Sequence, residues 1–394
     1  MPHVEEIFDK NGELKAYKAI VETGTDKKRK RRTKTFSIEK EGARKAKKKA
    51  DIALAEMITD REGGTMVDPS RISLGDYLDH WLENHKKPNI QTTTYDGYKV
   101  KINAHIKPTI GDIALQGLEP YHIESYFASK RKNGNRVTEE GLSENTLKKH
   151  YVLLNSALKR AIKLKLIKYN PMEAIEPPKP EKTEAPVMIK EDYEKLLNIL
   201  KEDLLMFTLI FTDLMTGMRR SEILGLEWPE VDLEKGIIDV KQALVAVSGG
   251  VEHKQKTKND TSRRKIKISK TLIDILKKFQ LEQKKMKLKL GIQTKEKDKD
   301  YVFCKLDGTN YNPKYYTDKL NEYLKKAKLS SKYTIHTLRH TFATINVNSG
   351  VDAEIVQKML GHSTISTTLD IYYHHDIDQQ DEALNALERA INID

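Results

Sequence analysis

The stretch LLMFTLIFTDLMTGMRRSEILGLEW, residues 204–228, predicts two helices joined by a tight turn. Its first half is an apolar run, and Gly217 suits the left-handed conformation that ends a helix. Arg219 follows this turn and precedes the second helix, for which Ser221 is a possible N-cap. Rigid elements on both sides would hold the arginine in place. A surface arginine at a helix start explains this motif alone equally well.

Strand-like segments follow these helices. They cover 236–247, 251–259 and 263–269, with a Gly249-Gly250 turn after the first. Lys258 lies where two of the strands are joined, so its side chain could swing over a bound backbone. A lone lysine in KQKTKNDTSRRK is also consistent with a solvated surface.

The segment HTLRHTFAT, residues 336–344, carries two further candidates. His336 and Arg339 are three residues apart and therefore share one face of a predicted helix. His340 suggests zinc, but Thr337 stands where a metalloprotease motif needs glutamate, and no nearby carboxylate completes the site. We therefore interpret His340 as a packed or supporting residue and predict no metal.

The motif DAEIVQKMLGHSTISTTLDIYYHH begins at residue 352. It predicts a helix with Asp352 as N-cap and Gly361 as left-handed end, which places His362 just past the helix. Ser366 can cap a further short helix that carries Tyr372. The inward positions of the first helix are predicted to be Ile355, Val356, Met359 and Leu360.

Composition narrows the class of protein. The 394 residues predict two or three domains, and 70 Lys or Arg against 58 Asp or Glu give a net charge of +12, which favours a polyanionic partner. No apolar run predicts a membrane span, and MPHVEEIFDK lacks the apolar stretch of a signal peptide, so we expect the cytosol. The single cysteine, Cys304, excludes an internal disulfide and a multi-cysteine zinc site, and its apolar setting indicates a buried structural thiol.

The N-terminal region holds much of the positive charge, since residues 10–50 contain 16 Lys or Arg and 5 Asp or Glu. It predicts a strand at 14–22, a basic turn at 24–34, a returning strand at 34–40 and a helix at 41–58. A solvated basic arm is the alternative, and either form attracts phosphates by releasing counterions. The helix positions expected to face the sheet are Ala46, Ala50, Ala53, Leu54, Met57 and Ile58.

A helical region follows the linker-like segment 61–70, and a stiff, proline-rich connector at 177–186 ends it. We therefore predict domains at 1–65, 72–176 and 187–394. Tyr95, Tyr98 and Tyr151 could contact DNA, although aromatic residues at helical spacing are more typical of a core. The last helix of the region has a basic exterior and an apolar side formed by Leu147, Tyr151, Leu154, Leu158, Ile162 and Leu166.

Taken in order, TGMRRSEILGL, HTLRHTFAT, MLGHSTISTT and DIYYH resemble the catalytic boxes of tyrosine recombinases of the phage integrase family, over roughly the last 200 residues. The resemblance implies a mainly α catalytic domain with a small antiparallel sheet and a C-terminal tail helix. The middle region resembles the family's all-α core-binding, SAM-like domain. The N-terminal region resembles the small α+β arm-binding domain, a short antiparallel sheet plus a helix, found in integrases of phages and conjugative or integrative elements.

The resemblance implies that Arg219 and Arg339 clamp a phosphate, with His336 beside the second arginine and His362 as the second histidine. Glu222 resembles the acidic residue after the first arginine and would orient it. An arginine fork can hold two phosphate oxygens, and each preformed donor typically contributes on the order of 3 kcal/mol to transition-state stabilisation.

Lys258 would be the strand-turn lysine and Tyr372 the nucleophile. The segment after Lys258 looks longer than in many relatives, so Lys256 remains an alternative. We choose Tyr372 over Tyr373 because the family usually has one residue between the nucleophile and a histidine. A phenol with a pKa of about 10 needs assistance, for which His336 is the candidate base, and Lys258 is the candidate proton donor to the departing 5′ oxygen.

The implied function is site-specific recombination of a mobile element. Tyr372 would form a 3′-phosphotyrosine link, and a partner strand's hydroxyl would reverse the step without ATP or a metal. The implied partners are double-stranded DNA with core-type and arm-type sites, a homotetramer on that DNA, an excisionase and a host DNA-bending protein, in the bacterial cytosol or nucleoid. The expected DNA contacts are Lys28, Arg29, Lys30, Arg31, Arg32, Lys148, Lys149 and Arg160.

Two other functions remain open at this point. A type IB topoisomerase would use similar chemistry without sequence preference, although the additional DNA-binding regions argue against it. A noncatalytic DNA-binding regulator would leave Tyr372 and the arginine pair unexplained. The tail helix at 381–394 could pack on its own domain, whereas the resemblance favours docking on a neighbouring protomer.

Overall fold

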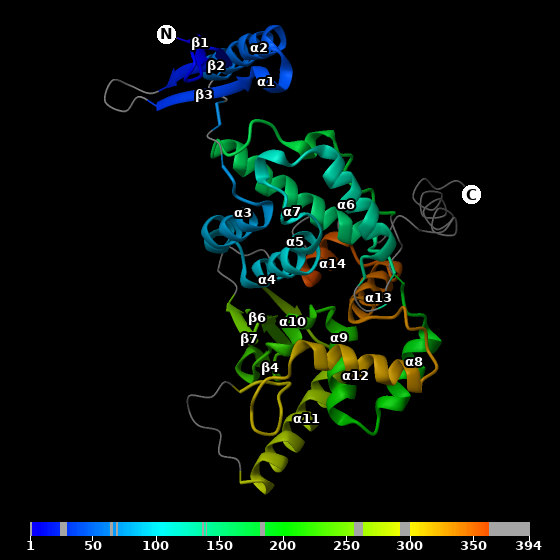
Figure 1. The fold of residues 1–394 in the computed structure, drawn as a ribbon. Coiled ribbons are helices and arrows are strands. Elements are labelled where there is room, and N and C mark those ends of the chain that lie inside the picture. Colours follow the sequence, from blue (N-terminus) through cyan, green and yellow to red (C-terminus); the bar gives the residue numbers. More distant parts are fainter. Residues whose placement is uncertain are drawn as a thin grey trace, which may run out of the picture. The chain divides into compact units, whose positions relative to one another are not determined.

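The computed structural model describes residues 2–23, 30–63, 66–67, 70–135, 138, 140–181, 186–255, 263–291 and 300–361. These residues belong to two compact units that divide between residues 182 and 183. The chain has small antiparallel sheets at its N-terminus and in a mainly helical C-terminal unit (Figure 1). None of the described helices is long and apolar enough to cross a membrane.

A three-stranded antiparallel sheet begins the chain. Strands β1 (His3–Phe8), β2 (Leu14–Thr23) and β3 (Lys30–Ser37) lie in the order β1-β2-β3. A short helix, α1 (Ile38–Glu41), leads into α2 (Ala43–Glu62), which packs on the sheet. The predicted sheet and helix are confirmed, and β1 is a strand that the sequence patterns did not single out. The buried positions of α2 are Ala46, Ala50, Ala53 and Met57, with Leu54 and Ile58 partly buried.

The predicted basic turn at 24–34 is wrong in extent, because β3 already begins at Lys30. Arg31 and Arg32 therefore lie in a strand, opposite Glu22 and Val21 of β2. The Arg31 guanidinium donates a 2.9 Å hydrogen bond to the Glu22 carboxylate. Cross-strand pairs of opposite charge stabilise an antiparallel ladder, which lets the pairing continue into the basic run.

Helices form the rest of the first unit. They are α3 (Leu74–Trp81), α4 (Thr92–Lys101), α5 (Lys107–Ile110), α6 (Pro120–Asn133) and α7 (Glu144–Lys163). One π-helical turn extends α3 and another extends α4, at Leu82–Lys86 and Ile102–Ile106. The apolar side predicted for the last helix lies in the core, and Tyr95, Tyr98 and Tyr151 are partly buried against it, which favours their core role.

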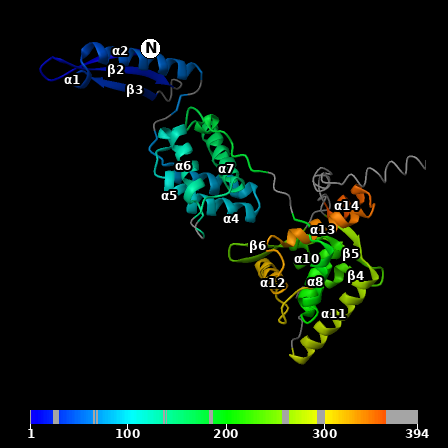
Figure 2. The same cartoon turned by 90° about the vertical axis from the view of Figure 1, so that its right-hand side faces the viewer.

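The second unit is built around α9 (Leu204–Thr216), which packs against α8 (Lys190–Leu200), α10 (Arg220–Leu224), α11 (Lys270–Lys289) and α13 (Ile335–Asn348). The other helices among the described residues of this unit are α12 (Pro313–Lys326) and α14 (Ala353–Leu360). Figure 2 shows α13 and α14 together at one end of this unit, with α11 along its edge. The apolar positions of α9 and its neighbours form one continuous core.

Two small sheets complete the described part of the second unit. Strands β4 (Val231–Asp232), β5 (Ile237–Val240) and β8 (Arg264–Lys267) pair in the order β4-β5-β8, and β6 (Gln242–Val247) forms a hairpin with β7 (Gly250–Gln255). The stretch 236–247 is thus divided between two sheets. The buried thiol predicted at Cys304 is confirmed, and burial raises its pKa.

Candidate active site

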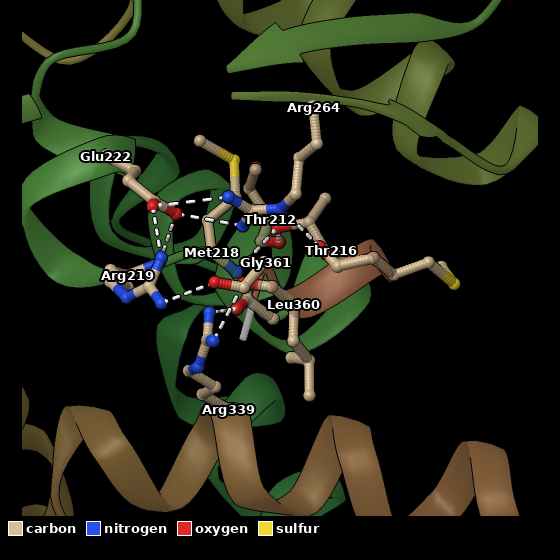
Figure 3. A network of polar contacts seen from close by, with 11 residues as sticks. Thr212, Thr216, Met218, Arg219, Glu222, Arg264, Arg339, Leu360 and Gly361 are labelled. Atoms are coloured by element: carbon tan, nitrogen blue, oxygen red, sulfur yellow. Dashed lines mark hydrogen bonds and ion pairs between the residues drawn. The ribbon is translucent and has the colours of Figure 1, made fainter. Parts of the chain in front are cut away.

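The turn after α9 is a crowded junction. Gly217 adopts the left-handed conformation, with φ of 58°, which confirms the predicted helix end. A Cβ at this position would lie 2.6 Å from Phe342 Cδ1 and 2.7 Å from Leu360 Cδ2, so only glycine fits without rearrangement. The Thr212 hydroxyl donates to the Thr208 carbonyl at 2.6 Å. The Thr216 hydroxyl donates to the Thr212 carbonyl, also at 2.6 Å (Figure 3). Close packing around Gly217 and the hydrogen bonds of the two threonines therefore both restrain this turn.

Arg219 is the N-cap of α10 and is bound on two sides. Its backbone N–H donates to Glu222 Oε2 at 2.9 Å, and its Nη1 donates to Glu222 Oε1 at 2.8 Å. Its Nη2 donates to the Gly361 carbonyl at 2.7 Å. The prediction of Ser221 as N-cap is wrong, because the helix begins at Arg220 and Ser221 lies inside it. Arg219 takes the N-cap position, and its backbone N–H is satisfied by the Glu222 side chain.

Arg339 lies on α13 and is 8% exposed. Its Nη1 donates to the Gly217 carbonyl, and its Nη2 donates to the Leu360 carbonyl at 2.8 Å. Burial, followed by the nearby charge of Arg219, lowers the pKa of Arg339, yet a guanidinium stays protonated at neutral pH. A buried cation held by neutral carbonyls suits an incoming anion.

His336 also lies on α13, one turn before Arg339, and is partly open to solvent. Partial burial of the ring, followed by the charges of Arg220, Arg339 and Arg219, lowers its pKa. At neutral pH the ring is therefore uncharged and able to accept a proton. His340 is partly buried, and burial lowers its pKa, with smaller effects from His336 and Arg339.

A third arginine, Arg264, belongs to the same cluster and was missed by sequence reasoning. Its Nη2 donates to Glu222 Oε2 at 2.9 Å, and its Nη1 donates to Glu222 Oε1 at 3.2 Å. Its Nε donates to the Met359 carbonyl. The strand pattern contained a signal, because Arg264 has the same parity as Ile266 and Ile268, which are both buried, and so shares their face of the strand.

A buried carboxylic acid lies one turn before this junction. Asp213 accepts a 2.8 Å hydrogen bond from the Tyr316 hydroxyl on its Oδ2, while its Oδ1 has no hydrogen-bond partner in the described part of the chain. Burial raises the pKa of Asp213 to about 7, although the Tyr316 hydrogen bond and the Arg339 charge oppose the rise. As the only charged residue in the apolar run 204–216, it could have been singled out from sequence.

The structure therefore brings together Arg219, Glu222 and Arg339, with His336 one turn from Arg339. The predicted ends of α14, Asp352 and Gly361, are confirmed. Ile355 was expected to face inward but is 51% exposed, because α14 packs through Val356 and Leu360. Lys256, Lys258, His362, Ser366, Tyr372, Tyr373 and the tail at 381–394 lie outside the described residues.

Among the predicted DNA contacts, Lys28 and Arg29 also lie outside the described residues. Lys148 and Lys149 are exposed on α7. Arg160 is partly buried, and its Nε has no hydrogen-bond partner in the described part of the chain.

Comparison with known proteins gives matches to two family models. The phage integrase family matches residues 186–379, and the N-terminal SAM-like domain of phage integrases matches residues 73–130. A tyrosine recombinase XerC-like protein of Caldanaerobacter subterraneus subsp. tengcongensis is 29% identical over 96% of this chain and 97% of its own length. The ICEBs1 integrase of Bacillus subtilis is 26% identical over 78% of this chain and 79% of its own.

Solved structures share the fold. The integrase of transposon Tn1549, in complex with a circular intermediate DNA, superposes with a TM-score of 0.67 at 21% identity and covers 80% of this chain and 99% of that one. A lambda integrase dimer bound to a core site has a TM-score of 0.58 at 17% identity and covers 94% of this chain and 96% of that one.

Proposed function

The chain belongs to the phage integrase family of tyrosine recombinases, and from this premise we propose that it is an integrase that cuts and rejoins DNA at specific sites to integrate and excise a mobile element. A sequence relative that is named as an integrase supports this function. So does a solved structure of similar fold, the Tn1549 integrase in complex with DNA. The strongly basic composition suits a polyanionic substrate.

The arginine cluster around Glu222 is the observation that carries the proposal. Arg219 and Arg264 both bind the Glu222 carboxylate, and Arg339 joins them through the Leu360 carbonyl, next to the Gly361 carbonyl that Arg219 binds. The Arg219 side chain is 36% exposed, whereas that of Glu222 is 1% exposed. Phosphoryl transfer gathers negative charge on nonbridging oxygens, and donors fixed before the reaction stabilise that charge without reorganisation. A cationic cluster whose Arg219 guanidinium is partly exposed suits a phosphodiester.

We assign Tyr372 as the nucleophile on this phosphate and His336 as the base that assists it. Lys258 is assigned as the proton donor to the 5′ oxygen and His362 as the second histidine. The residue roles rest on the motifs, and the lowered pKa of His336 supports its role as a proton acceptor at neutral pH. Neither ATP nor a metal ion enters this scheme.

The same proposal covers the DNA-binding parts. Residues 1–65 would bind arm-type sites, and residues 72–176 would bind core-type sites through basic faces that include Lys148 and Lys149. Four protomers would assemble on two duplexes, with the tail at 381–394 docking on a neighbour. An excisionase and a host DNA-bending protein would set the direction, in the bacterial cytosol.

The function can be tested with a nicked duplex whose sequence is taken from the junctions that flank the coding region in its source genome. Cleavage releases a short strand, so the covalent adduct accumulates and migrates more slowly in a denaturing gel. The wild-type protein and Tyr373→Phe should form the adduct, and Tyr372→Phe should not. An adduct that survives in Tyr372→Phe moves the nucleophile to Tyr373.

Two further outcomes distinguish the alternatives. Relaxation of supercoiled plasmid without any target sequence would indicate a topoisomerase. Binding of the junction sequence without any adduct, by a protein with both tyrosines intact, would indicate a noncatalytic regulator.

A further inference from the structure

Three successive carbonyls at the C-terminal end of α14 each accept a hydrogen bond from a different arginine. The carbonyl groups at a helix end have no partners within the helix and carry partial negative charge. The donors are Arg264 for Met359, Arg339 for Leu360 and Arg219 for Gly361. The end of α14 is therefore fixed by side chains from β8, α13 and the start of α10.

Arg264, unlike the partly exposed Arg219, is turned toward protein. Its side chain is 7% exposed, and its two terminal nitrogens bind the two oxygens of Glu222, which is 1% exposed. The same two oxygens also accept hydrogen bonds from the backbone N–H and the Nη1 of Arg219. Glu222 is thus a shared anchor between a buried arginine and the accessible one.

Arg264 also packs on Gly361. A Cβ at Gly361 would lie 3.0 Å from Arg264 Nη1 and 3.2 Å from its Cδ, so the guanidinium covers the last turn of the chain before His362. In addition, Arg264 is the first residue of β8, directly after the segment that contains both candidate lysines. The Arg264 side chain is therefore linked to Arg219 through Glu222, and it contacts Gly361, the residue before His362. In the sequence, Arg264 also follows closely on the segment that holds Lys256 and Lys258.

We propose that Arg264 is a positioning residue for DNA strand cleavage, which holds Arg219 through Glu222 and holds the end of α14 through the Met359 carbonyl. The proposal rests on the proposed recombinase function. Arg264 does not touch the phosphate; it sets the geometry of groups that do. A planar fork is needed, because lysine has one nitrogen and cannot bind both Glu222 oxygens and the Met359 carbonyl in the same arrangement.

Single-turnover cleavage of the nicked duplex, measured at saturating protein, tests the proposal. Arg264→Ala should lower the cleavage rate on the order of 100-fold, since small misplacements of catalytic groups have effects of this size. Arg264→Lys should recover part of the loss. The dissociation constant for the same duplex should change less than about threefold in both variants, because Arg264 is turned away from solvent. Arg263→Ala is the matched control, since Arg263 is exposed and adjacent, and it should cleave at the wild-type rate.

A double-variant comparison identifies the path of the effect. If Arg264 acts through Glu222, Arg264→Ala combined with Glu222→Gln should lower the rate little more than Glu222→Gln alone. Rate losses that multiply in the double variant would overturn the Glu222 route and leave only the contact with the Met359 carbonyl, and wild-type cleavage by Arg264→Ala would overturn both routes.

A readout that needs no catalysis separates this proposal from the proposed function. Hydrogen exchange of the amides at 219–223 and 356–361 should be faster in Arg264→Ala, and in Arg264→Lys to a lesser degree, but unchanged in Arg263→Ala. A wild-type protein that forms no adduct refutes the recombinase function. If the wild-type protein forms the adduct, and Arg264→Ala shows faster exchange but cleaves at the wild-type rate, then the positioning role of Arg264 is refuted and the recombinase function stands. If Arg264→Ala does not fold, Arg264→Lys carries the same tests.

Discussion

Arg219 donates a 2.7 Å hydrogen bond from Nη2 to the carbonyl of Gly361, a residue 142 positions later in the chain. The first arginine box and the end of α14 are thereby joined directly. Arg339 adds a parallel link, since it bridges the Gly217 carbonyl and the Leu360 carbonyl. The two arginines thus hold the turn before α10 and the end of α14 together.

Arg339→Lys should disable cleavage while leaving the fold intact. A lysine ammonium can reach one of the two carbonyls but cannot bridge Gly217 and Leu360 with separate nitrogens. We expect the single-turnover cleavage rate to fall about 100- to 1000-fold. Thermal unfolding of the variant provides the control, and a cleavage loss that merely follows a loss of folded protein would contradict a role in phosphate binding.

The cleavage rate should depend on the ionisation of His336. Partial burial of the ring, followed by the charges of Arg220, Arg339 and Arg219, lowers its pKa below 6.5. If the neutral ring accepts the tyrosine proton, the rate rises with pH through that lowered pKa and is level at neutral pH.

Arg220 offers a way to move this profile. Removing its charge in Arg220→Ala raises the pKa of His336, so the rising limb should shift to higher pH. In His336→Gln the rising limb should disappear. A limb that stays in place in both variants would assign the titration to another group.

Asp213→Asn should stabilise the protein more at pH 8 than at pH 5. The pKa of Asp213 is raised from 3.8 to about 7, so between these values the folded state binds a proton that the unfolded state has lost. Stability therefore falls as the pH rises through this window and stays low above it. The full effect is on the order of 4 kcal/mol.

Asparagine has no charge to bury and can still accept the Tyr316 hydrogen bond. Differential scanning calorimetry at the two pH values measures the difference. Equal shifts of the unfolding temperature at pH 5 and pH 8 would show that Asp213 ionises normally in the folded protein.

The local parts of this site could be predicted from sequence, whereas the long-range parts could not. Gly217 and the Asp352-to-Gly361 helix follow from capping rules that act within a few residues. The place of Arg264 beside Glu222 depends on how β8 packs against α10, 42 residues apart. Sharing a strand face with buried Ile266 indicates that the Arg264 side chain points inward, but it does not identify the partner of that side chain.

Ile355 shows the opposite error. Hydrophobicity placed it inside, but an eight-residue helix that packs on one side through Val356 and Leu360 leaves its neighbouring position in water. The width of a buried face depends on the packing partner, which the helix's own sequence does not specify.

Gly217→Ala should destabilise the second unit more than a left-handed conformation alone requires. An alanine with positive φ costs about 1–2 kcal/mol, and here its Cβ would also meet Phe342 and Leu360 at 2.6 and 2.7 Å. Gly350→Ala is the matched control, because Gly350 has φ of 81° and nothing within 4 Å of the added atom. Denaturant unfolding should give a larger loss for Gly217→Ala, and equal losses would show that α13 and α14 yield without cost.

The choice between Lys258 and Lys256 can be made by changing the leaving group. A lysine that protonates the departing 5′ oxygen becomes dispensable when that oxygen is replaced by sulfur, because a thiolate, with a reference pKa of about 8.5, departs without a proton. On ordinary DNA, alanine at the proton donor should slow cleavage by at least about 100-fold. On a duplex with a 5′-bridging sulfur, the same variant should cleave at nearly the wild-type rate. Alanine at the other lysine, which would act only through DNA contact, should cause the same modest defect on both substrates.

Lys258→Ala is the variant we expect to be rescued by sulfur. Rescue of Lys256→Ala instead would move the general acid two residues toward β7. A defect in Lys258→Ala that sulfur does not relieve would mean that this lysine stabilises the phosphate rather than donating the proton.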